Sequence, residues 1–297
     1  MTSETKPSDA STVRKGPTVD DVREFWNSNP LWTGESAIEP GTMAFFEEHR
    51  RVYHEDCFAG AVDERIFMPG DKNAKVLDLG CGIGFWLVEF WSRGYRNLSG
   101  ADLSDASLEI AHKRCELYGV EATLHQANAE ALEFADASFD HVNCQGVIHH
   151  TPDTEAALNE IARVLKPGGT ASVSVYYQNF VLRNWSIFRP LARMAGAVGS
   201  RLKGRGREHI YNIPDADEIV RYYDGNANPV GKAYSVAQVR AMAEPCFEIE
   251  EIMYHFFPAR SLPVGMPKFL HRFLDRKLPF MVYCNLRRQD SAAETAC

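Results

Sequence analysis

The sequence predicts an α/β fold built on a mostly parallel sheet. Between residues 75 and 177, short apolar runs alternate with segments of helical periodicity, as in strands joined by crossover helices. The first run, residues 76–79, is almost wholly apolar, which is typical of a strand buried on both faces. Acidic or amide residues follow several of these runs. Because ligands of such sheets bind beyond the carboxyl ends of the strands, we expect a ligand site at that edge.

A glycine-rich turn follows the first strand. Gly80, Gly82 and Gly84 stand at alternate positions, where the missing Cβ atoms allow a sharp bend and a close approach to a ligand. The helix that follows presents free N–H groups to that ligand. The spacing is G-x-G-x-G instead of the dinucleotide fingerprint G-x-G-x-x-G, and no P-loop lysine follows. Phe85 and Trp86 open the helix, and this aromatic pair favours an adenosyl or alkyl group over a pyrophosphate.

The later segments continue the alternation. Residues 98–102 are predicted to form a second strand ending at Asp102, whose carboxylate can accept hydrogen bonds from two ribose hydroxyls. Ser104 is a suitable N-cap for a helix that reaches residue 118. Asp78 has two interpretations, a ligand contact or a residue that closes its strand by bonding backbone amides. Further strands are expected at residues 122–125, 139–144 and 170–176, and a helix at 153–165 that stops at the Lys-Pro-Gly-Gly of 166–169.

The flanking segments are rich in aromatic residues. Residues 18–70 are expected to form an N-terminal helical segment that begins with a short helix over 19–27. An inserted helical segment is expected at residues 178–245, and two closing strands at residues 246–288. The polar tail at residues 1–17 is predicted to be disordered, and residues 289–297 form a second tail.

Five motifs in order carry a specific resemblance. They are VLDLGCGIG at 76–84, GADLS at 100–104, NAEAL at 128–132, GVIHHTPD at 146–153 and RVLKPGG at 163–169. Residues 75–177 are similar to class I S-adenosylmethionine-dependent methyltransferases, in the branch that includes the ubiquinone and menaquinone C-methyltransferases. The resemblance implies a Rossmann-like, seven-stranded, mostly parallel sheet with helices on both faces and an antiparallel last strand. It also implies that the N-terminal and inserted helical segments form a lid over a cofactor-binding core at residues 71–177.

The resemblance also implies which residues bind S-adenosylmethionine, with no metal expected. Three glycines, Gly80, Gly82 and Gly84, would wrap the methionine part beside Asp78, and Asp102 with Leu103 would bind the ribose. Asn128, Ala129 and Glu130 would flank the adenine, and Gln145 and Gly146 would line the floor near the sulfonium. The family usually has aspartate where this chain has Asn128. An amide oxygen still accepts a hydrogen bond from the adenine amino group, so we expect binding to be kept.

The candidate catalytic residues are imidazoles and phenols. Methyl transfer from a sulfonium is an in-line displacement, which a dry and aligned pocket favours. A base is needed only if the acceptor must lose a proton, and His149, His150 and His209 are candidates because imidazole titrates near neutrality. Tyr177 and Tyr211 are placed to orient an acceptor. Each of these residues also fits a structural role in the core or in a turn.

These observations predict methyl transfer to a small molecule that has an apolar or aromatic portion, with an oxygen or carbon acceptor favoured. Two alternatives stay open. The chain could methylate a protein-bound or carrier-bound substrate, or it could be a scaffold that binds the cofactor without catalysis.

Composition and charge limit which partners and which cell compartment we expect for the chain. A formal net charge of −8 disfavours nucleic acid, and the scattered cysteines favour a cytoplasmic protein without structural zinc. No run of eighteen apolar residues predicts a transmembrane segment. One basic segment, residues 181–210, carries six arginines and one lysine against a single glutamate. It is interpreted as an amphipathic cover helix with a solvated basic face, or as a patch for an anionic ligand or surface. The sequence leaves the oligomeric state open.

Overall fold

A computed structural model describes residues 16–68, 70–197, 202–204, 207–225, 228–262 and 265–290, without the side chains of residues 208 and 209. The expected tails fall almost wholly outside these ranges, at residues 1–15 and 291–297.

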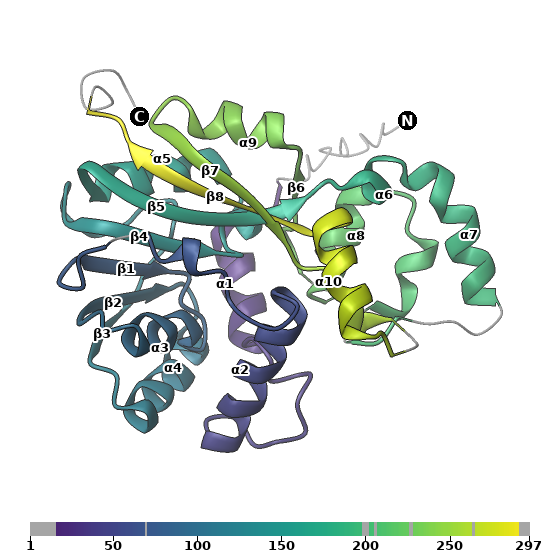
Figure 1. Cartoon of the computed structure of the whole chain (residues 1–297), viewed down its shortest axis with the longest axis horizontal. Coiled ribbons are helices and arrows are strands. Elements are labelled where there is room, and N and C mark those ends of the chain that lie inside the picture. Colours follow the sequence, from purple (N-terminus) through teal and green to yellow (C-terminus); the bar gives the residue numbers. More distant parts are fainter. Residues whose placement is uncertain are drawn as a thin grey trace, which may run out of the picture.

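The described residues form one sheet of eight strands (Figure 1). Seven of them lie side by side in the order β3-β2-β1-β4-β5-β8-β7. The first five strands run parallel, and β8 is antiparallel to both of its neighbours, as expected. The short strand β6, Ala233–Tyr234, pairs with the end of β5 and was not predicted. The other strands are β1 Lys75–Leu79, β2 Asn97–Asp102, β3 Ala122–Gln126, β4 Phe139–Gln145, β5 Leu165–Tyr177, β7 Phe247–His255 and β8 Met281–Arg288.

Helices cover both faces of the sheet (Figure 1). Helices α3, Phe85–Ser92, and α4, Asp105–Tyr118, pack on one face, and α5, Thr154–Val164, and α9, Val236–Ala243, pack on the other. The remaining helices are α1 Val19–Ser28, α2 Met43–Cys57, α6 Phe180–Arg183, α7 Trp185–Ala197, α8 Ala216–Tyr223 and α10 Lys268–Lys277. Four single 3₁₀ segments complete the set: η1 Glu64–Ile66, η2 Ile148–His150, η3 Arg207–Asn212 and η4 Ala259–Ser261. Among the helices described, none is long and apolar enough to cross a bilayer.

Local sequence signals set the ends of these helices. The Ser104 hydroxyl accepts a hydrogen bond from the Ser107 amide at the start of α4, and Gly119 ends that helix in a left-handed conformation. One boundary differs from the prediction, because β5 already begins at Leu165. Phe139 pairs with Leu165 and His141 pairs with Thr170, so residues 166–169 form an irregularity within the strand instead of a loop before it.

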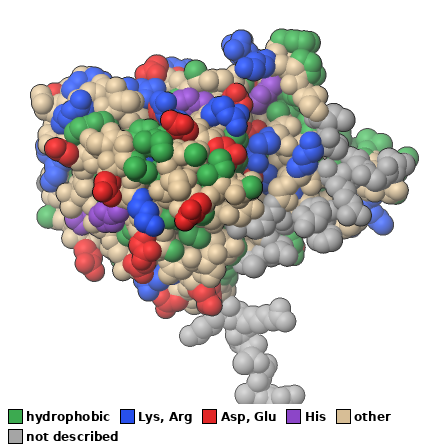
Figure 2. Space-filling view, turned by 90° about the horizontal axis from the view of Figure 1, so that it is seen from below, with side chains coloured by type: hydrophobic (Ala, Val, Ile, Leu, Met, Phe, Trp, Pro, Cys, Tyr) green, Lys and Arg blue, Asp and Glu red, His purple; other side chains and the backbone are tan. Residues whose placement is uncertain are grey.

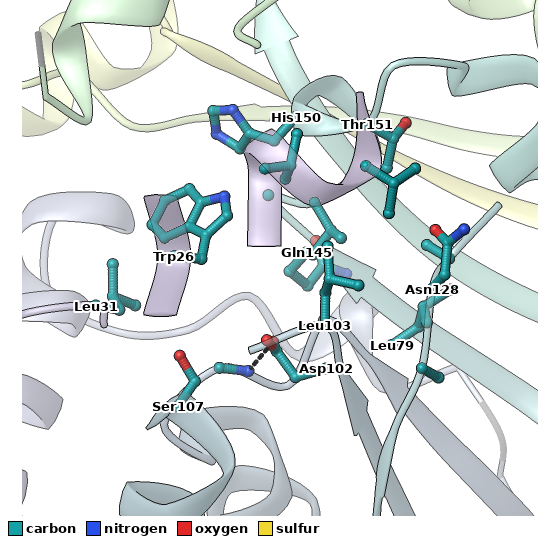
Figure 3. Close-up of a pocket in the computed structure, with 18 of the residues that line it drawn as sticks. Trp26, Leu31, Leu79, Asp102, Leu103, Ser107, Asn128, Gln145, His150 and Thr151 are labelled. Carbon is teal, nitrogen blue, oxygen red and sulfur yellow. Dashed lines mark hydrogen bonds between the residues drawn. The ribbon is translucent and has the colours of Figure 1, made fainter. Parts of the chain in front are cut away.

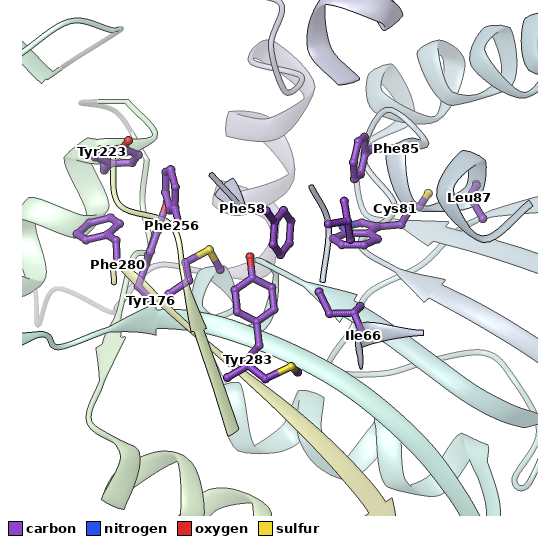
Figure 4. Packing of buried hydrophobic residues seen from close by; sticks show 14 of the residues in the cluster. Phe58, Ile66, Cys81, Phe85, Leu87, Tyr176, Tyr223, Phe256, Phe280 and Tyr283 are labelled. Carbon is purple, nitrogen blue, oxygen red and sulfur yellow. The ribbon is translucent and has the colours of Figure 1, made fainter. Parts of the chain in front are cut away.

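The aromatic pair that follows the glycine turn belongs to the core (Figure 4). Phe85 and Trp86 are buried, and the ring centroid of Tyr53 in α2 lies 4.2 Å from that of Phe85. The prediction that this pair lies beside an adenosyl or alkyl group was wrong. The first turn of α3 directs both rings into the cluster beneath α2, where burying large aromatic surface stabilises the fold.

Ion pairs with buried carboxylates join the flanking segments to the core. Glu89 of α3 accepts hydrogen bonds from Arg50 of α2 at 2.6 Å and from Arg93 at 2.7 Å, and its side chain is fully buried. Glu35, which follows α1, pairs with Arg207 at 3.1 Å and with Arg260 at 2.5 Å. These contacts join the N-terminal segment both to the sheet core and to the inserted segment.

The basic segment at residues 181–210 is not one continuous cover helix. Helices α6 and α7 end at Ala197, and Arg207 lies buried against Glu35 and Tyr223. Arg201 and Arg205 lie outside the described residues. Arg183 and Arg193 on the two helices are exposed, and so is Lys203, so the described part of the segment presents several cations to solvent.

Candidate functional site

A pocket lies between α1 and the carboxyl ends of β1, β2 and β4 (Figure 3). This is the edge at which the sequence predicts a ligand. Its walls combine residues from both parts of the chain: Val19, Val22, Trp26, Leu31, Leu79, Gly80, Gly82, Asp102, Leu103, Ser107, Ala127, Asn128, Ala129, Gln145, Gly146, Val147, His150, Thr151 and Pro152.

The glycine turn is clamped to the neighbouring strand. The amides of Gly80 and Cys81 both donate to the carbonyl of Ala101, at 2.7 and 3.0 Å. Gly80 has φ +71°, and a Cβ atom there would overlap the side chain of Val147. Only glycine fits both the conformation and the space. Gly80 and Gly82 line the pocket, whereas Gly84 packs against Ala111 of α4 and does not.

Asp102 connects the glycine turn to the wall of the pocket. Its Oδ2 accepts a hydrogen bond from the Gly82 amide, the dashed line in Figure 3, and its Oδ1 accepts one from the Ser104 amide, both at 2.8 Å. Burial raises the pKa of this carboxyl, and the two amides oppose that shift. The amides fix the orientation of the carboxylate and leave further lone pairs for a ligand. The predicted ribose acid is therefore held at the pocket wall.

Asp78 lies behind the pocket. It is buried, and its Oδ1 accepts a hydrogen bond from the Asn143 amide at 2.7 Å. Burial raises the pKa of Asp78 to about 7. Asp78 is not among the lining residues, and it ties β1 to β4 through a side chain instead of bonding backbone amides.

Two of the three residues predicted to flank an adenine line the pocket. Asn128 and Ala129 line it, and the Asn128 Oδ1 accepts a hydrogen bond from the Glu130 amide at 3.1 Å. The Glu130 carboxylate turns away and accepts a hydrogen bond from the Asp153 amide at 2.7 Å. Glu130 therefore supports the start of α5 and does not line the pocket.

The floor of the pocket contains a buried hydrogen-bond acceptor, the Oε1 atom of Gln145. Gln145 donates its Nε2 to Asn143 Oδ1, Ser172 O and Ser172 Oγ, each at 3.0 Å. Its Oε1 has no hydrogen-bond partner among the described residues. A buried amide oxygen without a donor is costly, so this atom suits a ligand that brings a donor or a positive charge. Gly146, the next residue, has φ +75° and also lines the floor.

His150 and His149 occupy different environments. His150 lines the pocket, and its ring contacts Trp26 edge to face at 5.4 Å between centroids. Both of its nitrogens face acceptors, with Val230 O at 2.8 Å from Nδ1 and Asp224 Oδ2 at 3.2 Å from Nε2. His149 is buried outside the lining, and burial lowers its pKa well below the ordinary value. His149 is therefore a neutral core residue.

Asp224 is a site residue that sequence reasoning missed. It accepts a hydrogen bond from the Tyr176 hydroxyl at 2.6 Å as well as facing His150. Burial raises its pKa, but the contacts with His150 and Tyr176 outweigh burial, and the pKa falls below its usual range. The sequence shows Asp224 only within a turn-like stretch, and no local pattern links it to His150.

Tyr177 and Tyr211 are not brought to the pocket. Tyr177 packs against Tyr254 of β7, with 5.3 Å between ring centroids, and is not a lining residue. The side chain of His209 lies outside the described residues. Tyr211 lies next to Gly196 of α7. Trp26 and Leu31 line the pocket although no motif marked them, since their proximity depends on how α1 docks, and Thr151 lines it from within the motif at 146–153.

The charge of the lining limits the kind of ligand. Among the described lining residues, Asp102 is the carboxylate, and there is no lysine or arginine. A pyrophosphate would place two negative groups beside Asp102 without a compensating cation, which is unfavourable in a partly buried site. The lining therefore suits a neutral or cationic ligand.

Comparisons with known proteins agree with this geometry. Residues 76–169 match the model of a family described as "Methyltransferase domain". Over these residues the chain is similar to a methyltransferase domain. The ubiquinone biosynthesis O-methyltransferase of Pseudomonas putida (strain W619) is 34% identical over 119 residues, which are 40% of this chain and 50% of that protein. The methyltransferase GfsG of Streptomyces halstedii is 36% identical over 192 residues, 62% of this chain and 60% of that protein. The chain thus spans about half the length of the first of these relatives.

Solved structures share the fold. An S-adenosylmethionine-dependent methyltransferase from Methanosarcina mazei superposes with a TM-score of 0.53 and 19% identity, covering 77% of this chain and 98% of that one. The cyclase SpnF superposes with a TM-score of 0.54 and 16% identity, covering 92% of this chain and 97% of that one. These likenesses support the Rossmann-like architecture.

Proposed function

We propose that this chain is an S-adenosylmethionine-dependent methyltransferase that methylates an oxygen atom of a small molecule bearing an acidic hydroxyl group, such as a phenol. The observation that carries the proposal is the Asp102 carboxylate, held by the Gly82 and Ser104 amides beside a pocket without lysine or arginine. The name of the Pseudomonas relative, an O-methyltransferase, supports oxygen as the acceptor atom.

The residues present fit S-adenosylmethionine. Asp102 would hold the ribose, Asn128 and Ala129 would contact the adenine, and Gly80 and Gly82 would lie along the methionine part. The free Gln145 Oε1 would face the positively charged end of the ligand. When bound, the cofactor supplies an electrophilic methyl group. The chain contributes alignment and exclusion of water, effects that reach about 7–11 kcal/mol in well-oriented systems.

The hydrogen bonds of His150 bear on the choice of acceptor. Its Nδ1 lies 2.8 Å from Val230 O and 3.3 Å from Asn228 Nδ2, and its Nε2 lies 3.2 Å from the Asp224 carboxylate. Both ring nitrogens are therefore engaged by protein groups. Asp102 is engaged by two amides, so neither of these titratable groups at the pocket wall is free to act as a base. An acceptor that ionises by itself, such as a phenol, does not need one.

The wall opposite the strand ends favours an aromatic acceptor. Trp26 and Leu31 supply apolar surface from α1 and the segment after it, and His150 holds the Trp26 ring from the side. An aromatic face also attracts a cation such as a sulfonium. We infer that the acceptor ring lies between these residues and the floor formed by Gln145.

The test is a matched panel of phenols and aliphatic alcohols. The full chain is incubated with S-adenosylmethionine and each acceptor, and products that gain one methyl group are located by fragmentation in the mass spectrometer. We expect methyl ethers of phenols and none from the alcohols. The rate should rise with pH until the phenol is ionised and then level off. Efficient methylation of aliphatic alcohols, or a methyl group on carbon, would contradict the proposed acceptor class.

A further inference from the structure

Two helices far from the pocket each expose a stripe of large apolar side chains. On α7 the stripe is Ile187, Leu191 and Met194, and on α10 it includes Phe269 and Phe273. These five side chains are between 56% and 76% exposed. Both helices lie on the side of the molecule away from α3 and α4 (Figure 1). Side chains this large and this exposed, at helical spacing, mark a surface that contacts another apolar phase.

The exposed charged side chains on these two helices are all positive. Residues 178–197 contain three arginines and no acid. On α10 the cations are Lys268, Arg272, Arg276 and Lys277, and the one acid, Asp275, is buried against His255. The chain as a whole has a net charge of −8, and Figure 2 shows acidic and basic side chains interspersed over the left part of the face it presents. The two helices therefore depart from the rest of the surface.

The two end segments of the printed sequence lack large apolar side chains that could cover these stripes. Residues 1–15 and 291–297, which lie outside the described part, contain no Phe, Trp, Tyr, Leu or Ile. A second copy packed symmetrically through α7 or α10 would place these cations against their own counterparts, which is unfavourable. The expected partner is negatively charged and has an apolar interior that these side chains can enter, without a groove of fixed shape.

We propose that α7 and α10 bind an anionic membrane surface. The arginine and lysine side chains contact the lipid headgroups, while the aromatic and aliphatic stripes enter the boundary between headgroups and acyl chains. Short helices with this composition lie in the plane of the interface and do not span the bilayer. This inference goes beyond the proposed function and does not depend on cofactor binding.

The experiment is co-sedimentation of the full chain with vesicles. One set is phosphatidylcholine alone, and the other is an equal mixture of phosphatidylcholine and phosphatidylglycerol. We expect binding only to the anionic vesicles and release at high salt, because salt screens exposed charges. The double variants Phe269→Ser/Phe273→Ser and Lys268→Glu/Arg276→Glu should each weaken partitioning by about tenfold or more. The matched control is Leu117→Ser, an exposed apolar residue on α4, which should bind like the unaltered chain.

Several outcomes would overturn the proposal. They are equal binding to both vesicle types, no binding to the anionic vesicles, or full binding by both double variants. Light scattering in the absence of vesicles could reveal one further contradicting outcome. Self-association that Phe269→Ser/Phe273→Ser abolishes would assign the stripe to a second copy. Unchanged unfolding midpoints would show that the variants fold. Because neither readout uses S-adenosylmethionine, a failure here is distinct from a failure of the proposed function.

Discussion

Two regions of the molecule are built by different kinds of contact: the half of the pocket at the strand ends, and the flanking segments around it, which we call the shell. At the strand ends, neighbouring parallel strands meet, and Gly82 reaches Asp102 through a backbone amide. In the shell, side-chain charges join segments far apart in the sequence, as Glu35 joins Arg207 and Arg260. The first region is fixed by backbone geometry, whereas the second depends on pairing buried charges. We therefore expect mutations in the shell to act on stability and mutations at the strand ends to act on ligand binding.

The largest expected effect comes from breaking the shell at Arg207. This side chain is 6% exposed and also donates to the carbonyl of Tyr223 and the hydroxyl of Ser261. Arg207→Met should lower the free energy of unfolding by about 3–5 kcal/mol, because its buried partners lose their cation. Urea denaturation measures this loss. Arg51→Met, which removes an exposed ion pair with Glu55, should cost less than about 1 kcal/mol.

Cofactor affinity in the Arg207→Met variant separates the two regions. Measured below its unfolding transition, the dissociation constant for S-adenosylmethionine should stay close to that of the unaltered chain. A large loss of affinity would show that the shell shapes the strand-end site directly, and the comparison would fail.

A second effect in the shell depends on pH. Burial raises the pKa of Glu89, but hydrogen bonds from His54, Arg50 and Arg93 outweigh burial and lower the pKa from 4.5 to about 2. Because the folded pKa lies below the unfolded one, this stabilisation is present above pH 4.5 and is lost as the pH falls toward 2. It amounts to about 3 kcal/mol. Glu89→Gln should be less stable at pH 7 and should show a flatter acid limb in urea titrations. An unchanged acid limb would refute the pairing.

The strand-end region is tested by adding one methyl group. In Gly80→Ala the new Cβ would overlap Val147 at a left-handed backbone position, so we expect a cost of about 2 kcal/mol and weakened cofactor binding. Gly82→Ala is the control, because φ there is +51° but the space is open. Its cost should be about 1 kcal/mol. Thermal unfolding and calorimetry give both quantities. If Gly80→Ala/Val147→Ala recovers nothing, the contact with Val147 is not the cause.

The same contrast explains what the sequence could predict. The alternation of strands and helices, the helix start at Ser104 and the position of Asp102 at the end of β2 follow from local patterns, and the antiparallel last strand followed from the family resemblance. The sequence could not show that Phe85 faces the core, because helical spacing alone does not say which neighbour covers a face. It could not pair His150 with Asp224, which is 74 positions away and whose approach depends on how the inserted segment folds back. Tyr177 was placed at the site because it follows the strand predicted at 170–176, but it is the last residue of β5 and packs against Tyr254.

The central claim is that the pocket binds S-adenosylmethionine through Asp102, and isothermal titration calorimetry tests it directly. The unaltered chain should bind S-adenosylmethionine and S-adenosylhomocysteine. Asp102→Ala should raise both dissociation constants by at least about tenfold, equivalent to 1.4 kcal/mol. The matched control, Asp105→Ala, removes an exposed acid at the start of α4 and should leave them unchanged. No heat of binding with the unaltered chain, or equal affinities for Asp102→Ala and Asp105→Ala, would contradict the account.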